Sequence, residues 1–418
     1  MDGLIDEWLD DPASRVVHVE EVEATAAMFA GLEPPLPTAL ADRLATVGVE
    51  RLYRHQARAV ESIRAATDTV IVAGTASGKS LCYQVPIVES LLTDDESTAL
   101  LLYPTKALAQ DQLRSIHKLA VPEMVEATYD GDTDSDQRTW VRKHANVVLT
   151  NPDMLHIGIL PHHGLWASFL SRLRFVVVDE MHMLRGIFGS HVSHVLRRLR
   201  RLAAHYGADP TFVFTSATIG NPGDLAAGLT GRAAHVIDED TSPTGDKTYV
   251  LWNPPLLDDG DGQRASALGE ATDVFLDLVG RDLHTIAFTR SRKGTELMYR
   301  WARERLTSDV AETIAAYRGG YLPKERRKIE ADLFAGKLRG VVTTNALELG
   351  IDVGSLDAAV LTTYPGTIAS FRQQTGRAGR TVEESLAVLV GGQDALDQYF
   401  MTHPEELFDR APEAAVIN

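Results

Sequence analysis

A run of small residues followed by a lysine and a serine is the first part of the sequence whose residue types could do chemistry. It comprises Ala73, Gly74, Thr75, Ala76, Ser77, Gly78, Lys79 and Ser80. Small residues let backbone N–H groups converge on phosphate oxygens at a helix N-terminus. A lysine at this spacing reaches the β- and γ-phosphates of a nucleotide, and the adjacent hydroxyl can bind Mg²⁺. The run therefore predicts a phosphate loop, with Ala73 where the usual pattern has glycine. An ordinary Gly/Ser turn is the alternative.

An acidic pair ends a second apolar run, "FVVVDEMH" (175–182). Parallel sheets place ligands at the carboxyl ends of their strands. We therefore expect Asp179 to hold Mg²⁺ through water and Glu180 to polarise an attacking water. His182 is expected to link this site to the far side of a cleft. The alternative is an acidic strand end without function, which the phosphate loop upstream disfavours.

Two smaller motifs accompany these sites. In "TSAT" (215–218), Ser216 and Thr218 place small hydroxyls at a strand end, where a helix cap is the alternative. In "YRHQ" (53–56), the amide of Gln56 donates and accepts at once, which suits an adenine edge.

The second half of the chain contributes arginines. "QQTGRAGR" (373–380) places Arg377 and Arg380 three residues apart, so that one helical turn would present both on one side. A guanidinium suits the charge that develops on a transferred phosphoryl group. A solvated basic helix start is the alternative. Gly350 and Asp352 add a tight turn with a carboxylate that could meet a ribose or an arginine.

The elements that position these motifs are short, continuous apolar runs, which predict buried strands. These runs cover 68–74, 98–104, 146–150, 174–180, 211–217, 284–290, 339–345, 356–365 and 386–392. Helical patterns such as 105–119 and 190–205 lie between them, so the chain is expected to be α/β with parallel sheets flanked by helices. Turn-rich sequence interrupts the alternation near 240–262. We expect an N-terminal extension (1–44), a first domain (45–240), a linker (241–262), a second domain (263–400) and a tail (401–418).

Composition narrows the class of protein. The 418 residues suffice for two domains, and no apolar run reaches the ~18 residues of a membrane span. The acidic start lacks the features of a signal peptide. Cys82 is the single cysteine, so the chain can form no internal disulfide. We predict a cytoplasmic protein without membrane contact. The formal net charge of −17 disfavours a broadly basic surface but is compatible with a local basic groove.

In their order, these motifs resemble superfamily 2 DEAD/DEAH-box (DExH) helicases over residues 50–400. The segments "GTASGKSLCYQ", "RGIFGSHV" and "YPGTIASFRQQTGRAGR" resemble those of the MrfA-type DNA repair helicases, which are relatives of the RecQ-type group. The resemblance implies two tandem RecA-like domains that bind ATP and Mg²⁺ between them and translocate 3′→5′ on DNA. It assigns coupling roles to Ser216, Thr218 and Gln373. The family's C-terminal four-cysteine zinc site is absent from these residues, so a truncated form of a longer protein is one interpretation.

The resemblance also implies a face that grips one nucleic-acid strand. Its residues would be Pro104, Thr105, Lys106, Thr150, Asn151, Pro152, Asp153, Arg290, Ser291, Arg292, Thr343, Thr344 and Asn345. Hydroxyls, N–H groups and a few cations suit backbone contacts, which carry no sequence information. Binding is therefore expected to be sequence-tolerant and salt-sensitive, to DNA rather than RNA. An RNA helicase and a truncated, non-processive ATPase or binding module are the alternatives.

Overall fold

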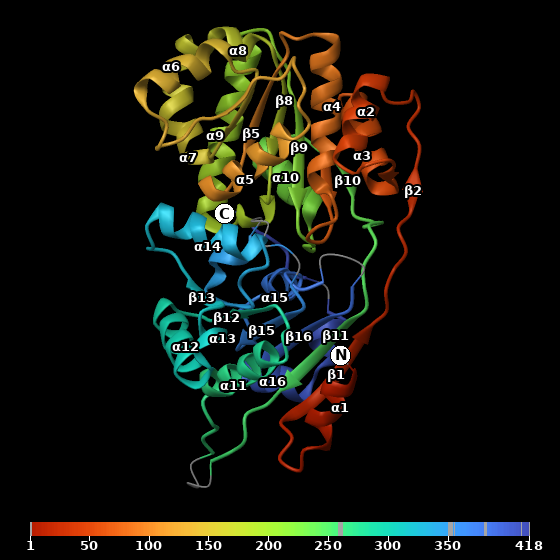
Figure 1. The fold of residues 1–418 in the computed structure, drawn as a ribbon. Helices are drawn as coiled ribbons and strands as arrows, with labels where there is room; N and C mark the ends of the chain where they lie inside the picture. Colours follow the sequence, from red (N-terminus) through yellow and green to blue (C-terminus); the bar gives the residue numbers. More distant parts are fainter. Residues whose placement is uncertain are drawn as a thin grey trace. The chain divides into compact units, whose positions relative to one another are not determined.

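The computed structural model describes residues 2–257, 262–349, 354, 356–379, 383–410 and 412–417. The chain divides into two compact units, which are considered separately (Figure 1). Ala27–Ser242 and Glu413–Asn418 form the P-loop unit, named for residues 73–80. Met1–Ala26 and Pro243–Pro412 form the arginine unit, named for Arg377. The chain therefore passes from one unit to the other after residues 26, 242 and 412.

A seven-stranded sheet in the order β10-β4-β9-β8-β5-β7-β6 forms the centre of the P-loop unit. Neighbouring strands are parallel throughout. The strands are β4 (Thr69–Val72), β5 (Thr98–Leu102), β6 (Glu126–Thr128), β7 (Val147–Thr150), β8 (Leu173–Val178), β9 (Thr211–Ser216) and β10 (His235–Ile237), with a separate pair of β2 (Phe29–Ala30) and β3 (Leu52–Tyr53).

Helices cover both faces of this sheet, as Figure 1 shows. They are α2 (Thr38–Thr46), α3 (Arg54–Arg64), α4 (Lys79–Thr93), α5 (Lys106–His117), α6 (Ser135–His144), α7 (Pro152–Met154), α8 (Ala167–Ser171), α9 (Gly186–His205) and α10 (Pro222–Thr230), with short turns η1 (Leu155–Ile159), η2 (Leu160–Trp166) and η3 (Met181–Met183). Alternate residues of β4 enter different cores. Val70 and Val72 pack with α9 and α10, whereas Ile71 packs with α3 and α4. Burial on both faces explains why the strand is continuously apolar.

The arginine unit contains a second seven-stranded sheet, in the order β1-β11-β16-β15-β12-β14-β13. All neighbours are parallel except β1, which is antiparallel to β11. The strands are β1 (Val16–Val22), β11 (Lys247–Trp252), β12 (Thr285–Phe288), β13 (Ile314–Tyr317), β14 (Gly340–Thr343), β15 (Ala358–Thr362) and β16 (Ser385–Val390). The helices are α1 (Asp2–Asp10), α11 (Ala267–Gly280), α12 (Arg292–Arg305), α13 (Ser308–Ala311), α14 (Pro323–Phe334), the turn η4 (Asn345–Leu347), α15 (Ile368–Thr375), α16 (Ala395–Thr402) and α17 (Glu405–Phe408).

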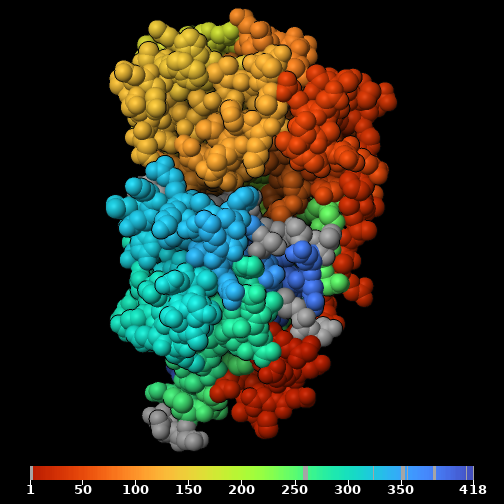
Figure 2. All heavy atoms as spheres, viewed as in Figure 1, coloured from red at the N-terminus to blue at the C-terminus, as the bar shows by residue number. Residues whose placement is uncertain are grey.

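The structure differs from the expected extension and linker. Residues 247–252, expected in the linker, form β11, which pairs with β16 on one side and β1 on the other. Residues 2–22, expected in an extension, supply α1 and β1 of the same unit. Leu4, Ile5 and Trp8 of α1 are buried in its core. Figure 2 shows these first residues, in red, against the green residues of the same unit. A polar edge strand and a single short helix give weak sequence patterns, so only the tertiary packing reveals them.

The end of the chain returns to the P-loop unit. Asn221 accepts a hydrogen bond from the Ala415 N–H (2.7 Å) and donates one to the Ala415 carbonyl (3.0 Å). Gly186 N–H donates to the Val416 carbonyl (2.6 Å). Across the described residues, the helices include none with the length and apolar content needed to cross a membrane.

Candidate nucleotide site

The predicted phosphate loop joins β4 to α4. Gly78 has a φ of +75°, and a Cβ at this position would lie 2.3 Å from Nε2 of Gln56. The Ser77 hydroxyl donates to the Gly74 carbonyl (2.8 Å), which closes the turn. The loop therefore needs glycine at 78, both for the left-handed backbone and for the approach of a neighbouring side chain.

The two side chains expected to meet the nucleotide have protein partners in this structure. Lys79 Nζ donates to the carbonyl of Ala73 (2.9 Å) and to that of Gly74. The Ser80 hydroxyl donates to Oε1 of Gln112 in α5 (2.8 Å). Both contacts hold the polar ends beside the loop. Gln112 was not singled out in the sequence because its partner lies 32 residues away.

Gln56 braces the loop through its amide. Its Nε2 donates to the Gly78 carbonyl (3.1 Å), and its Oε1 accepts from the Tyr53 N–H (2.9 Å). The adenine contact expected from the sequence remains a prediction, since both ends of the amide contact backbone groups here.

His55 was missed by the sequence analysis, although it precedes Gln56. Its ring is buried. Nε2 lies 3.1 Å from the Ser77 carbonyl oxygen, and Nδ1 lies 2.9 Å from the Thr241 hydroxyl. Burial lowers the pKa of His55, which favours the neutral ring. His55 therefore ties the phosphate loop to the segment that follows β10.

The acidic pair lies at the carboxyl end of β8, as predicted. Asp179 is buried and accepts a hydrogen bond from the Thr215 hydroxyl. Burial, followed by the neighbouring Glu180 carboxylate, raises the pKa of Asp179. A buried carboxylate with a raised pKa is a site that a cation would stabilise. Together with the Ser80 hydroxyl and nucleotide phosphates, it fits the oxygen ligands that Mg²⁺ prefers.

Glu180 and His182 connect the acidic pair to the "TSAT" strand end. Glu180 has a φ of +52°, and its N–H donates to the Thr215 hydroxyl (3.3 Å). His182 Nδ1 lies 3.4 Å from a Glu180 carboxylate oxygen and 3.3 Å from the Ala217 backbone nitrogen. The Ser216 carbonyl in turn accepts from the Ala73 N–H (3.2 Å). The phosphate loop, the acidic pair and the "TSAT" turn thus form one hydrogen-bonded network, while Thr218 is exposed.

In the arginine unit, Arg377 follows α15 and is 2% exposed. Its guanidinium donates to the Glu348 carbonyl. Gln373 is also buried in α15. Lys247 Nζ donates to the carbonyls of Thr375 and Ala378, at 2.9 Å each. Three further predicted residues, Gly350, Asp352 and Arg380, lie outside the described residues.

Several predicted nucleic-acid residues cap helices, which is the alternative that the sequence left open. The Thr105 hydroxyl accepts from the Leu108 N–H (3.2 Å), Asn151 from the Met154 N–H (2.8 Å), and Thr344 from the Ala346 N–H (3.3 Å). The exposed members are Thr105, Lys106, Asp153, Arg290, Ser291, Arg292 and Asn345, and the buried members are Thr150, Pro152, Thr343 and Thr344. Lys106 pairs with Asp132 (2.9 Å) and Arg290 with Asp394 (2.9 Å). The nucleic-acid roles stay predictions.

The fold and the nucleotide site together define a P-loop protein with two RecA-like units. Residues 53–225 match the family described as DEAD/DEAH box helicase, and residues 270–382 match the helicase conserved C-terminal domain. The chain belongs to the superfamily 2 DExH helicases, of the MrfA and HRQ1 type.

Similar proteins span more than this chain does. The uncharacterized ATP-dependent helicase YprA of Bacillus subtilis is 43% identical over 97% of this chain and 54% of its own length. The ATP-dependent helicase HRQ1 of Saccharomyces cerevisiae is 40% identical over 95% of this chain and 38% of its own. The crystal structure of the DUF1998 helicase MrfA bound to DNA and AMPPNP has a TM-score of 0.94 and 42% identity, and covers 100% of this chain and 59% of that one. The chain thus spans between 38% and 59% of the length of these three proteins.

Proposed function

We propose that this chain is the ATP-hydrolysing core of a DNA helicase that translocates on one strand, with 3′→5′ as the expected direction and DNA repair as the expected process. The main support is that β8, β9 and β4 are neighbours in one parallel sheet. The acidic pair, the "TSAT" turn and the phosphate loop follow these strands at the same edge. The DNA bound in the similar MrfA structure supports DNA as the substrate. We further propose a cytoplasmic location.

The residues present support defined roles in ATP hydrolysis. Lys79 would leave the carbonyls of Ala73 and Gly74 to neutralise the β- and γ-phosphates, with which it forms stronger charge-assisted bonds. Ser80 and Asp179 would hold Mg²⁺, which neutralises phosphate charge when bound. Glu180 would orient the attacking water, and His182 would keep its carboxylate in place. Arg377 would stabilise the charge that develops on the γ-phosphoryl group.

ATP turnover by purified protein tests this proposal. We expect Lys79→Ala to lose nearly all turnover and nucleotide affinity. Glu180→Gln is expected to bind nucleotide normally but to hydrolyse it about 100-fold more slowly, because the amide is a poor base. Lys118→Ala, at an exposed lysine outside the loop, is the matched control and should behave as wild type. Normal turnover by Lys79→Ala would overturn the site assignment.

The substrate is tested by stimulation of this ATPase. Single-stranded DNA is expected to raise ATP turnover more than single-stranded RNA of the same length and sequence does. Strand separation of 3′-tailed, and not 5′-tailed, DNA duplexes would support the proposed direction. Stronger stimulation by RNA would contradict the DNA assignment while leaving the ATP site intact.

A further inference from the structure

We propose that residues 240–247, here called the crossover segment, relay the state of the phosphate loop to the loop that carries Arg377. In this relay Asp240 is a positioning residue for the phosphate loop, and Lys247 is a positioning residue for Arg377. The inference rests on the proposed function, since it concerns the same nucleotide site. The crossover segment contains the point after residue 242 at which the chain leaves the P-loop unit.

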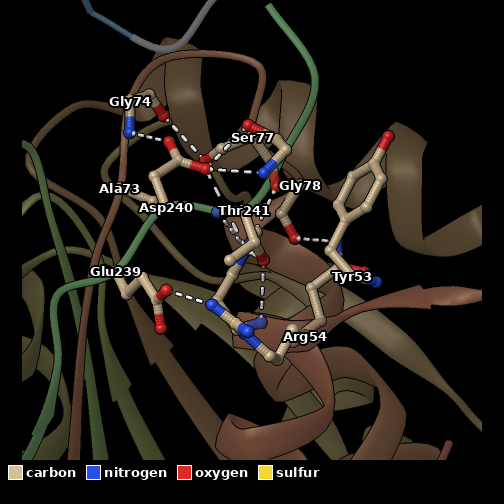
Figure 3. Close-up of polar contacts among 12 residues, drawn as sticks. Tyr53, Arg54, Ala73, Gly74, Ser77, Gly78, Glu239, Asp240 and Thr241 are labelled. Atoms are coloured by element: carbon tan, nitrogen blue, oxygen red, sulfur yellow. Dashed lines mark hydrogen bonds and ion pairs between the residues drawn. The ribbon is translucent and has the colours of Figure 1, made fainter. Parts of the chain in front are cut away.

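At its first end, the crossover segment contacts the phosphate loop directly (Figure 3). Asp240 Oδ2 accepts a hydrogen bond from the Gly74 N–H (2.8 Å). Thr241 presents its hydroxyl to the ring of His55 (2.9 Å), whose other nitrogen lies 3.1 Å from the Ser77 carbonyl oxygen. Two consecutive residues of the segment thus contact the loop at two places, one through a carboxylate and one through the buried histidine.

A single peptide group joins Asp240 to the catalytic lysine. The carbonyl of this group belongs to Ala73 and accepts from Lys79 Nζ (2.9 Å), and its N–H belongs to Gly74 and donates to Asp240 (2.8 Å). Hydrogen bonds on the two sides of one peptide group polarise and strengthen each other. When Lys79 turns from the Ala73 carbonyl to a phosphate, the bond to Asp240 weakens. The Asp240 carboxylate also carries the same sign of charge as the arriving phosphates.

The middle of the segment is held along its length. Ser242 donates from its backbone N–H (3.0 Å) and its hydroxyl (2.7 Å) to Oδ1 of Asp240. Thr244 exchanges two backbone hydrogen bonds with Thr25, at 3.1 Å each. Asp246 accepts from the Ser385 N–H on its carbonyl (2.9 Å) and from the Ala24 N–H on its side chain (2.8 Å). In the proposed relay these bonds hold residues 240–242 together and tie residues 244 and 246 to Ala24, Thr25 and Ser385, so that a displacement at Asp240 passes to Lys247 through the covalent chain.

At its last end, the segment sets the position of Arg377. The final carbonyls of a helix have no partner within the helix. Lys247 donates to the carbonyl of Thr375, the last residue of α15, which also accepts from the Ala378 N–H (3.3 Å), and to the carbonyl of Ala378, the residue after Arg377. Removal from water lowers the pKa of Lys247 to about 8, because burial disfavours the charged ammonium. The arginine therefore lies between two carbonyls that the same ammonium group holds.

Hydrogen–deuterium exchange on the whole chain tests the relay without requiring turnover. Mg²⁺ and a non-hydrolysable ATP analogue are expected to change deuterium uptake in peptides covering 240–247 and 368–379. Asp240→Asn should bind the analogue about fivefold more tightly, because one repelling charge is gone. It should also lose most of the change in uptake at 368–379. An unaltered change at 368–379 in Asp240→Asn would overturn the relay.

Glu239→Gln is the matched control for Asp240→Asn. It removes the same charge one residue earlier, where the carboxylate pairs with Arg54 and Arg58 of α3 and not with the phosphate loop. It should keep wild-type affinity and uptake. If both substitutions have equal effects, the loss of one negative charge near the site explains the change in affinity and uptake, and the relay is also overturned. If wild-type protein binds no nucleotide at all, the proposed function fails instead, which separates the two hypotheses.

Steady-state kinetics test the other end. Lys247→Met is expected to lower kcat for ATP about tenfold with an unchanged nucleotide Kd, since Arg377 acts on charge that develops during the reaction. Lys247→Gln keeps a donor at this position and is expected to lower kcat less, and it serves if Lys247→Met does not fold. Lys337→Met, at an exposed lysine of the same unit paired with Asp332, is the control. A wild-type kcat in Lys247→Met and Lys247→Gln would remove Lys247 from its role.

Discussion

At the scale of single residues, Gly78 is the most constrained position of the phosphate loop. A methyl group there meets Nε2 of Gln56 at 2.3 Å, and the left-handed backbone costs about 1–2 kcal/mol for any other residue. Gly78→Ala must therefore displace Gln56 and strain the turn. We expect nucleotide affinity, measured with a fluorescent ATP analogue, to fall at least about tenfold, which is about 1.4 kcal/mol.

Gly48→Ala separates the two causes of this effect. Gly48 has a φ of +83°, and no heavy atom lies within 4 Å of a Cβ built there. Gly48→Ala thus introduces a similar backbone strain far from any predicted nucleotide contact. It should lower the free energy of unfolding and leave nucleotide affinity unchanged. If both variants bind nucleotide alike, steric contact with Gln56 is not what makes Gly78 necessary.

Residue types and local spacing were enough to predict that Lys79 and Ser80 follow the loop after one strand and that Asp179 follows another, because these placements depend on neighbours in sequence; their roles in catalysis stay predictions. His55, Gln112 and Asp240 could not be found in this way. Their contacts with the loop join residues 22, 32 and 166 positions apart. The sequence also could not decide between a helix cap and a nucleic-acid contact, since one hydroxyl type serves both purposes.

At the scale of elements, strands buried on both faces were predictable and edge elements were not. β4 is continuously apolar at Val70, Ile71 and Val72 because helices cover both of its faces, and such a run can be recognised in the sequence. β1, with the sequence "VVHVEEV", is exposed at Val17, Glu21 and Val22 and only partly buried elsewhere, so it gives little signal in the sequence. β11 was not predicted because turn residues stand on both sides of it in the sequence. It is nevertheless an interior strand, since it lies between β1 and β16 in the sheet.

A substitution in the N-terminal helix α1 tests whether this helix is a structural part of the arginine unit. Trp8 of α1 packs edge-on against Trp252 of β11, with ring centroids 5.4 Å apart, and its Nε1 donates to Asp277 (2.9 Å). Trp8→Ala should lower the free energy of unfolding by about 3 kcal/mol, through lost burial and the loss of the hydrogen bond to Asp277. Urea denaturation measures the change. Leu9→Ala, at a side chain on the same helix that is about half exposed, should cost less than about 0.5 kcal/mol. Equal small effects would mean that α1 is a dispensable extension.

At the scale of the whole molecule, two α/β units were predictable from the alternation of strands and helices. Their boundaries were not, because the chain leaves and re-enters each unit. An N-terminal segment belongs to the arginine unit and a C-terminal segment to the P-loop unit, and no local pattern marks either assignment. The net charge of the whole chain bears on how strongly nucleic-acid binding should depend on salt.

If this chain binds DNA as proposed, its net charge of −17 favours contact through a few local cations over a wide basic surface. Lys106, Arg290 and Arg292 are the cations among the predicted contacts, and each neutralised phosphate of a single strand contributes a slope of about −0.7 to a plot of the log association constant against log salt. We therefore expect log affinity for single-stranded DNA to fall with log salt at a slope of about −2. Fluorescence anisotropy with a labelled oligonucleotide measures it. A slope steeper than about −5 would require a wide basic surface and would contradict this expectation.

Arg290 offers the sharpest form of that prediction, because it is paired with Asp394 (2.9 Å) in this structure. We expect Arg290 to leave this ion pair when it binds a phosphate, in which case the pair competes with DNA binding. Arg290→Ala should lower the affinity and make the salt slope shallower by about 0.7. Asp394→Asn should raise the affinity, since the arginine no longer has a competing carboxylate. Lys337→Ala, at an exposed lysine paired with Asp332, should change neither quantity. Weaker binding by Asp394→Asn would show that the ion pair orients Arg290 for DNA instead of competing with it.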